Sequence, residues 1–171
     1  MFPPHGGFSI VTPRRALIEM AFHEAGHATV ALLLGERWQS ATLIKHKSRW
    51  MTMGYMGLST TKEPRENGLI AAGGQIGEEI WRRRRRDGAT NTPDAGASTL
   101  DMEIMFEHGD PTDLLDQARE LLIGHEDLVA RIARCLVRFG KVDVELVRKR
   151  LPRKMYTSGG LATLGSRVTP R

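Results

Sequence analysis

The sequence has a single cysteine and no long apolar run, and each shortage excludes a class of protein. Cys135 has no second cysteine to pair with, so an intramolecular disulfide framework and a cysteine-rich zinc site are both excluded. No apolar stretch approaches the roughly 20 residues of a membrane-spanning helix. The first residues also lack the charged and then apolar pattern of a signal peptide. We therefore expect a cytoplasmic protein without a transmembrane segment.

Aromatic residues are also scarce, at 6% of the chain, and this bears on the net charge of +5. The positive charge is concentrated in the run Arg82–Arg86 and in a tail, residues 152–171, that has no acidic residue. The rest of the chain is mildly acidic. Trp81 is the aromatic residue that borders the run Arg82–Arg86, and no aromatic residues are interleaved with its arginines, so neither base stacking nor a nucleic-acid partner is expected. A solvated charged surface is the ordinary explanation of such a run.

The length of 171 residues and the hydrophobic content of 40% predict one globular domain. Residues 1–11 are rich in proline and glycine and are expected to form a loosely ordered lead-in. Residues 152–171 have few large apolar side chains and are expected to form a flexible basic tail. The domain itself is expected to span residues 12–151.

Apolar spacing predicts a mainly α domain with a small β-hairpin or sheet. Helices are expected at 13–34, 65–82, from 98 or 99 to 106, from 110 or 112 to 122, at 128–139 and at 142–151. Short strands are expected at 40–45 and 52–58. In the second helix, Gly73, Gly74 and Gly77 cost about 1 kcal/mol each relative to alanine. Close packing against the first helix would compensate for that cost.

The first predicted helix carries the motif His23-Glu24-Ala25-Gly26-His27. Histidines four residues apart lie on the same helical face, so both imidazoles can bind one metal ion. Zinc takes nitrogen ligands at about 2.0–2.1 Å, and in catalytic sites it leaves one position open for water. Glu24 lies beside the histidines and can act as a general base on that water. The alternative is two ordinary helix histidines, but a glutamate in such an apolar helix needs a reason.

Two histidines leave the third protein ligand to be found, and several carboxylates are candidates. Asp101 falls in the first turn of a predicted helix, where it is either a third zinc ligand or only a partner of the helix dipole. Glu78 and Glu79 could bind the metal, accept a hydrogen bond from a ligand histidine, or pair with nearby arginines. Asp94 is a further alternative. We favour Asp101.

The motifs, taken in order, resemble the peptidase domain of the FtsH-like ATP-dependent zinc metalloproteases. The resemblance covers roughly residues 16–151. It rests on His-Glu-Ala-Gly-His-Ala at 23–28, Gly-Gly-Gln-Ile-Gly-Glu-Glu at 73–79, Gly-Ala-Ser at 96–98 before Asp101, and the helical end from 118 to 147. It implies a zincin-like metalloprotease domain in which His23, His27 and Asp101 bind Zn²⁺ and Glu24 is the catalytic base.

The chain departs from this family in two ways. Two residues, Thr99 and Leu100, separate Gly-Ala-Ser from Asp101, whereas the family usually has one. The chain also lacks the Gly-x-x-x-x-Gly-Lys-Ser/Thr phosphate loop of the family's ATPase module. We therefore expect polypeptide substrates that are short, already unfolded or delivered by a separate ATPase partner. The family forms hexamers largely through its ATPase ring, so homo-oligomer formation stays open here.

These observations predict a zinc-dependent endopeptidase, with the strand at 51–58 aligning the substrate as an added strand. An ordinary hairpin is the alternative for that strand. The competing function is a catalytically idle metal-binding module that uses the Arg82–Arg86 run and the basic tail to bind an acidic protein or nucleic acid. A regulatory partner of a separate ATPase is a third possibility.

Overall fold

The computed structural model describes residues 13–35, 38–45, 52–58, 64–85 and 99–150. Within these ranges the chain is mainly helical with one small antiparallel sheet, as predicted. The helices are α1 (Pro13–Leu33), α2 (Pro64–Arg84), α3 (Thr99–His108), α4 (Pro111–Leu122), α5 (Glu126–Phe139) and α6 (Val144–Arg150), and the strands are β1 (Trp38–Lys45), β2 (Thr52–Leu58) and β3 (Lys141–Asp143). The predicted lead-in, the tail and Asp94 lie outside the described residues.

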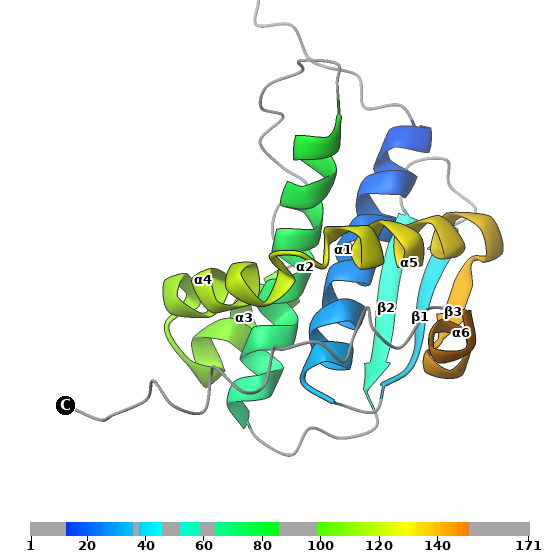
Figure 1. Cartoon of the computed structure of the whole chain (residues 1–171). Coiled ribbons are helices and arrows are strands. Elements are labelled where there is room, and N and C mark those ends of the chain that lie inside the picture. The colour runs from blue at the N-terminus through cyan, green and yellow to red at the C-terminus, as the bar shows by residue number, and fades with distance from the viewer. Residues whose placement is uncertain (1–12, 36–37, 46–51, 59–63, 86–98, 151–171) are drawn as a thin grey trace, which may run out of the picture.

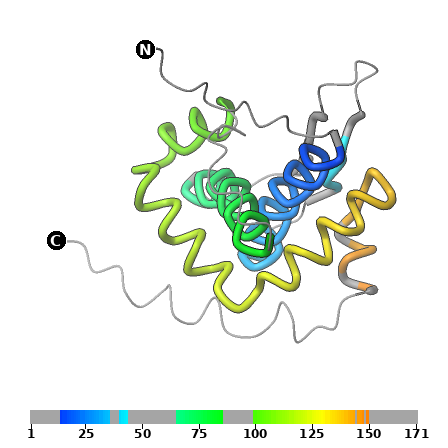
Figure 2. The backbone as a smooth tube through the Cα atoms, turned by 90° about the horizontal axis from the view of Figure 1, so that it is seen from above, coloured from blue at the N-terminus to red at the C-terminus, as the bar shows by residue number. Residues whose placement is uncertain are grey.

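Helices α1 and α2 run antiparallel to each other at the centre of the molecule (Figure 1). Helix α1 packs against α2 on one side and against the sheet on the other, while α3 and α4 pack against α2. Viewed from above, α4 and α5 form a V around the central pair (Figure 2). The site carried by α1 is therefore covered by elements that come from much later in the chain.

Helix α1 is buried over the whole stretch from residue 21 to residue 33. A helix that is covered on every side belongs to the core, and its alanines let neighbouring elements approach closely. Yet His23, Glu24 and His27 are buried in this same stretch. Buried polar groups cost free energy unless they have partners, so these three residues need an explanation.

Glycines allow α1 and α2 to pack with their backbones in contact, which confirms the close approach predicted from the sequence. A Cβ atom added to Gly26 would collide with the carbonyl of Gly73, and one added to Gly77 would collide with the carbonyl of Phe22. No side-chain movement relieves such a clash, because the obstructing atoms belong to the backbone. The glycines of α2 thus bring the two helices close enough to share one site.

The sheet has the strand order β2-β1-β3, and both pairings are antiparallel. Strand β3 was not predicted, because residues 142–151 were expected to form one helix. That prediction was wrong for its first two residues. Val142 is 1% exposed between two exposed neighbours, a strand pattern, and the Asp143 carboxylate accepts a hydrogen bond of 2.6 Å from the Leu146 N–H. Asp143 therefore caps α6 and ends β3.

Several predicted helix ends are confirmed. The Asp110 carboxylate caps α4 by accepting hydrogen bonds from the backbone N–H groups of Thr112 and Asp113. Gly140 follows α5 with φ 73°, and Gly35 follows α1 with φ 78°, a left-handed conformation that glycine adopts without strain. Across the described ranges, none of the helices combines the length and the apolar character needed to span a bilayer.

Candidate metal centre

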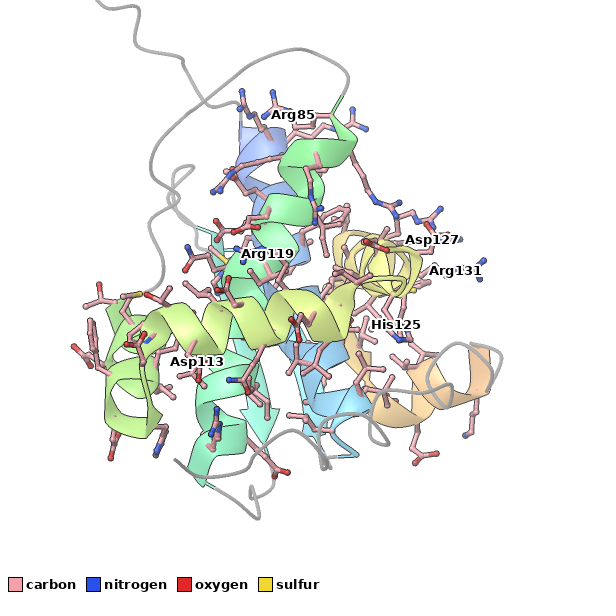
Figure 3. All side chains as sticks on the ribbon, turned by 60° about the vertical axis from the view of Figure 1, so that its left-hand side comes forward. Arg85, Asp113, Arg119, His125, Asp127 and Arg131 are labelled. Carbon is pink, nitrogen blue, oxygen red and sulfur yellow. The ribbon has the colours of Figure 1, made fainter. Side chains whose placement is uncertain are left out.

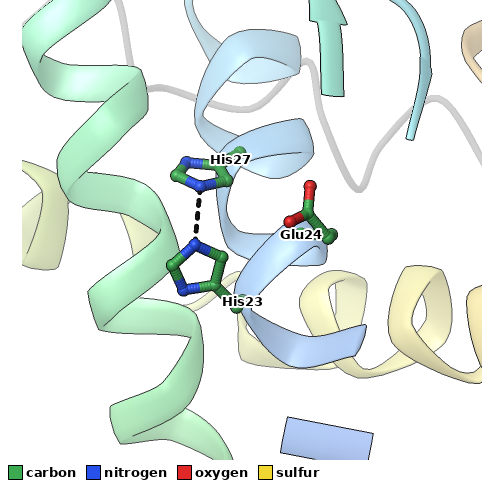
Figure 4. A group of neighbouring side chains, drawn as sticks. All are labelled: His23, Glu24 and His27. Carbon is green, nitrogen blue, oxygen red and sulfur yellow. Dashed lines mark hydrogen bonds between the residues drawn. The ribbon is translucent and has the colours of Figure 1, made fainter. Parts of the chain in front are cut away.

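The imidazoles of His23 and His27 meet in the space between α1 and α2. Their Nε2 atoms are 3.0 Å apart, and the rings lie edge to face with centroids 4.6 Å apart. Figure 4 shows both rings directed toward α2, while Glu24 leaves α1 on a different side. The four-residue spacing therefore brings the two Nε2 atoms to the same point, as predicted.

The outer nitrogen of each imidazole has a fixed hydrogen-bond acceptor. Nδ1 of His23 lies 2.8 Å from Oε1 of Glu78, and Nδ1 of His27 lies 2.6 Å from the carbonyl oxygen of Ile70. A carbonyl oxygen cannot donate, and neither can an ionised carboxylate, so both Nδ1 atoms carry the proton. In the neutral tautomers, each Nε2 then directs a lone pair at the other.

Asp101 adds a third acceptor at the same point. Its Oδ2 atom lies 3.0 Å from Nε2 of His23 and 3.5 Å from Nε2 of His27. The structure thus brings His23, His27 and Asp101 together, although 78 residues separate the aspartate from His23. Asp101 lies in the first turn of α3, which packs against α2, and its carboxylate is largely shielded from solvent.

Three lone pairs that face one another repel unless a cation lies between them. Burial alone lowers the pKa of His23, but hydrogen bonds with Asp101 and Glu78 outweigh it and raise that pKa to about 10. Burial raises the pKa of Asp101, but hydrogen bonds with His23 and His27 outweigh it and hold that pKa well below the usual range. The site therefore attracts positive charge. One proton can be shared by two of these atoms, whereas a metal ion can bind all three.

The spacing of the three atoms fits a small tetrahedral ion. Ligand atoms at 2.0–2.1 Å from zinc, placed at tetrahedral corners, lie about 3.3 Å from one another. The separations among His23, His27 and Asp101, at 3.0, 3.0 and 3.5 Å, bracket this value. Two imidazoles and one carboxylate are also a ligand set that catalytic zinc sites use, with the fourth position left for water or substrate.

Glu24 is a second carboxylate in the same site. It is 4% exposed, and its carboxylate lies within 4.8 Å of the imidazole nitrogens of His23 and His27. Its Oε2 atom is buried and makes no hydrogen bond within the described part of the chain. Burial raises the pKa of Glu24, against the opposite effect of the two histidines. A buried acceptor without a partner is costly, which points to a bound water or ligand there.

Glu78 supports the site from outside. Its two oxygens have separate tasks, because Oε1 binds His23 and Oε2 accepts a hydrogen bond of 2.8 Å from Arg82. Arg82 also lies 3.4 Å from the buried carboxylate of Glu19. This arrangement fixes the ring orientation of His23, as carboxylates commonly do behind metal-binding histidines.

Gly74 makes room for the histidines. A Cβ atom at this position would lie 2.6 Å from Nε2 of His27 and 2.7 Å from Cε1 of His23. The alternative ligand Glu79 is not at the site, because it pairs with Arg119 at 3.1 Å on the other side of α2. Of the two neighbouring glutamates, Glu78 alone reaches a histidine among the described contacts.

Sequence reasoning missed two supports of the site. The carbonyl of Ile70 belongs to the backbone, so no residue type could have indicated it. Pairing of Glu78 with a nearby arginine was one of the predicted alternatives, but the contact of Arg82 with Glu19 was not predicted, because it depends on how α1 and α2 are aligned. The spacing Glu78 to Arg82, four residues apart on one helix, was the one available signal for the ion pair.

Comparison with protein-family models finds none that matches the chain, and comparison with curated proteins finds no similar sequence.

Proposed function

We propose that this chain is a zinc-dependent metallopeptidase with a zincin-like site, as its resemblance to the FtsH-like peptidase domain suggests. The observation that carries the proposal is the convergence of Nε2 of His23, Nε2 of His27 and Oδ2 of Asp101 within 3.0–3.5 Å. In their neutral tautomers both histidines direct Nε2 lone pairs inward, beside the Asp101 carboxylate, which favours a cation bound among the three atoms. A purely structural site would have no use for the buried Glu24 carboxylate, whose Oε2 atom makes no hydrogen bond within the described part of the chain.

The residues divide the work between binding and proton transfer. His23, His27 and Asp101 hold the ion, while Glu78 and the Ile70 carbonyl keep the imidazoles in the binding tautomer. When bound, zinc supplies a Lewis acid that polarises a peptide carbonyl and lowers the pKa of a water molecule. Glu24 accepts the proton of the attacking water and returns it to the leaving amine.

The position of β2 supports a polypeptide as substrate. This strand is one of the two outer strands of the described sheet, pairs there only with β1, and packs beside α1. A free strand edge can bind an extended peptide through main-chain hydrogen bonds, as an added strand. Such binding requires an extended chain, so we propose short or unfolded polypeptides as substrates.

The Glu24→Gln variant tests the division of roles. The glutamine amide keeps the shape of the side chain but cannot accept the proton, so hydrolysis of an unfolded protein should fall by roughly 10²–10⁴-fold. The zinc content, measured by elemental analysis, should stay near that of the parent. A variant that cleaves at the parental rate would contradict the role of Glu24.

The same measurements separate the peptidase from an idle metal-binding module. A parent protein that binds zinc but cleaves neither unfolded casein nor short peptides favours the module. If the parent protein binds no zinc when it is refolded with the metal, both the peptidase and the metal-binding module are rejected. Inhibition by a chelator, reversed by added zinc, is the positive result that the peptidase requires.

A further inference from the structure

Arginines from three helices gather at the end of the central helix pair. Glu19 of α1 contacts Arg82 of α2, and the ring of Phe22 lies 5.3 Å from that of Trp81. Because the helices are antiparallel, this alignment sets the first turn of α1 beside the last turn of α2. Helix α5 joins them through Arg84, which donates a hydrogen bond of 2.8 Å to Asp127. Figure 3 shows Arg85 at this end of α2, with Asp127 and Arg131 on α5.

We call this surface the arginine end, and it consists of Arg14 and Arg15 of α1, Arg82, Arg83, Arg84 and Arg85 at the end of α2, and Arg131 and Arg134 of α5. The cations exceed the acids that they contact. Arg82 is paired with Glu19 and Glu78, and Arg84 is paired with Asp127. By contrast, Arg14, Arg83 and Arg131 are exposed and form no ion pair within the described ranges.

Helix stability explains only part of this accumulation. Arginines in the last turn of α2 interact favourably with the negative end of the helix dipole. Arg14 and Arg15 stand in the first turn of α1, which has no acidic residue, and there the dipole opposes positive charge. Arg131 and Arg134 lie within α5, near Asp127. The dipole opposes Arg14, which, like Arg83 and Arg131, forms no ion pair within the described ranges, so its positive charge is better explained by recognition of an anion.

We propose that the arginine end is an exosite for acidic segments of polypeptide substrates, an inference that rests on the proposed peptidase function. Guanidinium groups bind carboxylates through paired hydrogen bonds, and Arg82 and Arg84 already bind carboxylates of this chain. Stacking of single-stranded bases has little support, because Trp81 packs on Phe22 and lies under Arg85.

The exosite lies within reach of the metal centre. Helix α1 carries Arg14 and His23 nine residues apart, which corresponds to about 14 Å along the helix axis. An extended peptide covers that distance with about four residues. We therefore expect an acidic run to act when it is at least about four residues from the bond that is cleaved.

Two peptides with one cleavable core test this inference, one with a flanking run of four glutamates and one with four serines. At low salt the parent should cleave the glutamate peptide with a kcat/KM roughly tenfold higher, and 0.5 M NaCl should remove the difference. The double variant Arg83→Glu/Arg131→Glu should lose the preference. Its matched control, Lys141→Glu/Lys149→Glu, has the same net charge but changes exposed lysines of β3 and α6, and should keep it.

Equal cleavage of the two peptides by the parent would overturn the exosite and leave the peptidase standing. If no peptide is cleaved, the peptidase fails, and binding still tests the arginine end by itself. In that assay, a fluorescein-labelled octaglutamate should bind the Glu24→Gln protein. It should not bind the same protein with the additional substitutions Arg83→Glu and Arg131→Glu. Absence of such binding, or displacement of the peptide by a lower concentration of duplex DNA, would overturn an acidic polypeptide as the partner.

Discussion

Helix α2 has two polar faces, formed by the adjacent residues Glu78 and Glu79, and they differ in how the charge of the glutamate is balanced. Glu78 faces α1 and contributes to a cluster whose acceptors outnumber its donors, since His23, His27 and Asp101 direct lone pairs at one another. Glu79 faces α4, where the Arg119 guanidinium satisfies its carboxylate at 3.1–3.4 Å. The carboxylate of Glu79 is neutralised by Arg119, whereas the cluster beside Glu78 can bind a proton or, as we propose, a metal ion.

This difference is the one expected between the proposed metal site and a structural ion pair. Charge within the α2–α4 contact is balanced by the protein itself, so that contact needs no further component. The α1–α2 contact combines burial with an excess of acceptors, which is costly for a structural core and useful for binding a metal. Substitutions on the two faces should therefore affect different properties of the protein.

The largest effect is expected from Asp101→Ala. Removing one of three ligands should weaken zinc binding by more than the roughly 100-fold that the loss of an outer partner costs. Competition with a chelator of known affinity measures this, and Glu103→Ala, an exposed residue of the same helix, is the matched control. Equal zinc affinity of the two variants would reject Asp101 as a ligand and leave Glu24 as the candidate.

A smaller effect is expected from Glu78→Gln. The amide oxygen can still accept a hydrogen bond from Nδ1 of His23, but the charge that favours binding of a cation is lost. Zinc affinity should fall by about 10–100-fold, because Glu78 acts through His23 and not on the metal. The fold should be retained, which circular dichroism can verify. Unchanged affinity would show that Glu78 serves only to pair with Arg82.

Much of the fold could be predicted because its signals are local. The 3.6-residue spacing of apolar residues, the cap at Asp110 and the glycines at 35 and 140 indicated helices close to their observed ends. Strand β3 could not be predicted in the same way. Its three residues form a strand because β1 pairs with them, and that pairing depends on where α5 directs the chain.

The candidate site, too, could be predicted only where its features are local in sequence. The four-residue spacing of His23 and His27 is a local property of one helix, and it predicted their convergence. The approach of Asp101 depends on how α3 packs on α2, so residue spacing alone left it one candidate among several, and the family resemblance was what favoured it. Close packing of the α2 glycines against α1 was predicted from the sequence, but which of them lies against the rings of His23 and His27 was not, and it is Gly74.

The smallest effect is expected from Glu79→Gln, the same substitution one residue further along α2. Glu79 and Arg119 are about one-third exposed, and ion pairs at such positions contribute less than about 1 kcal/mol. The free energy of unfolding, measured with urea, should fall by no more than that, and zinc affinity should match the parent. A loss of zinc affinity as large as that of Glu78→Gln would mean that the two faces of α2 are coupled. The contrast between a closed ion pair and an incomplete metal site would then be wrong.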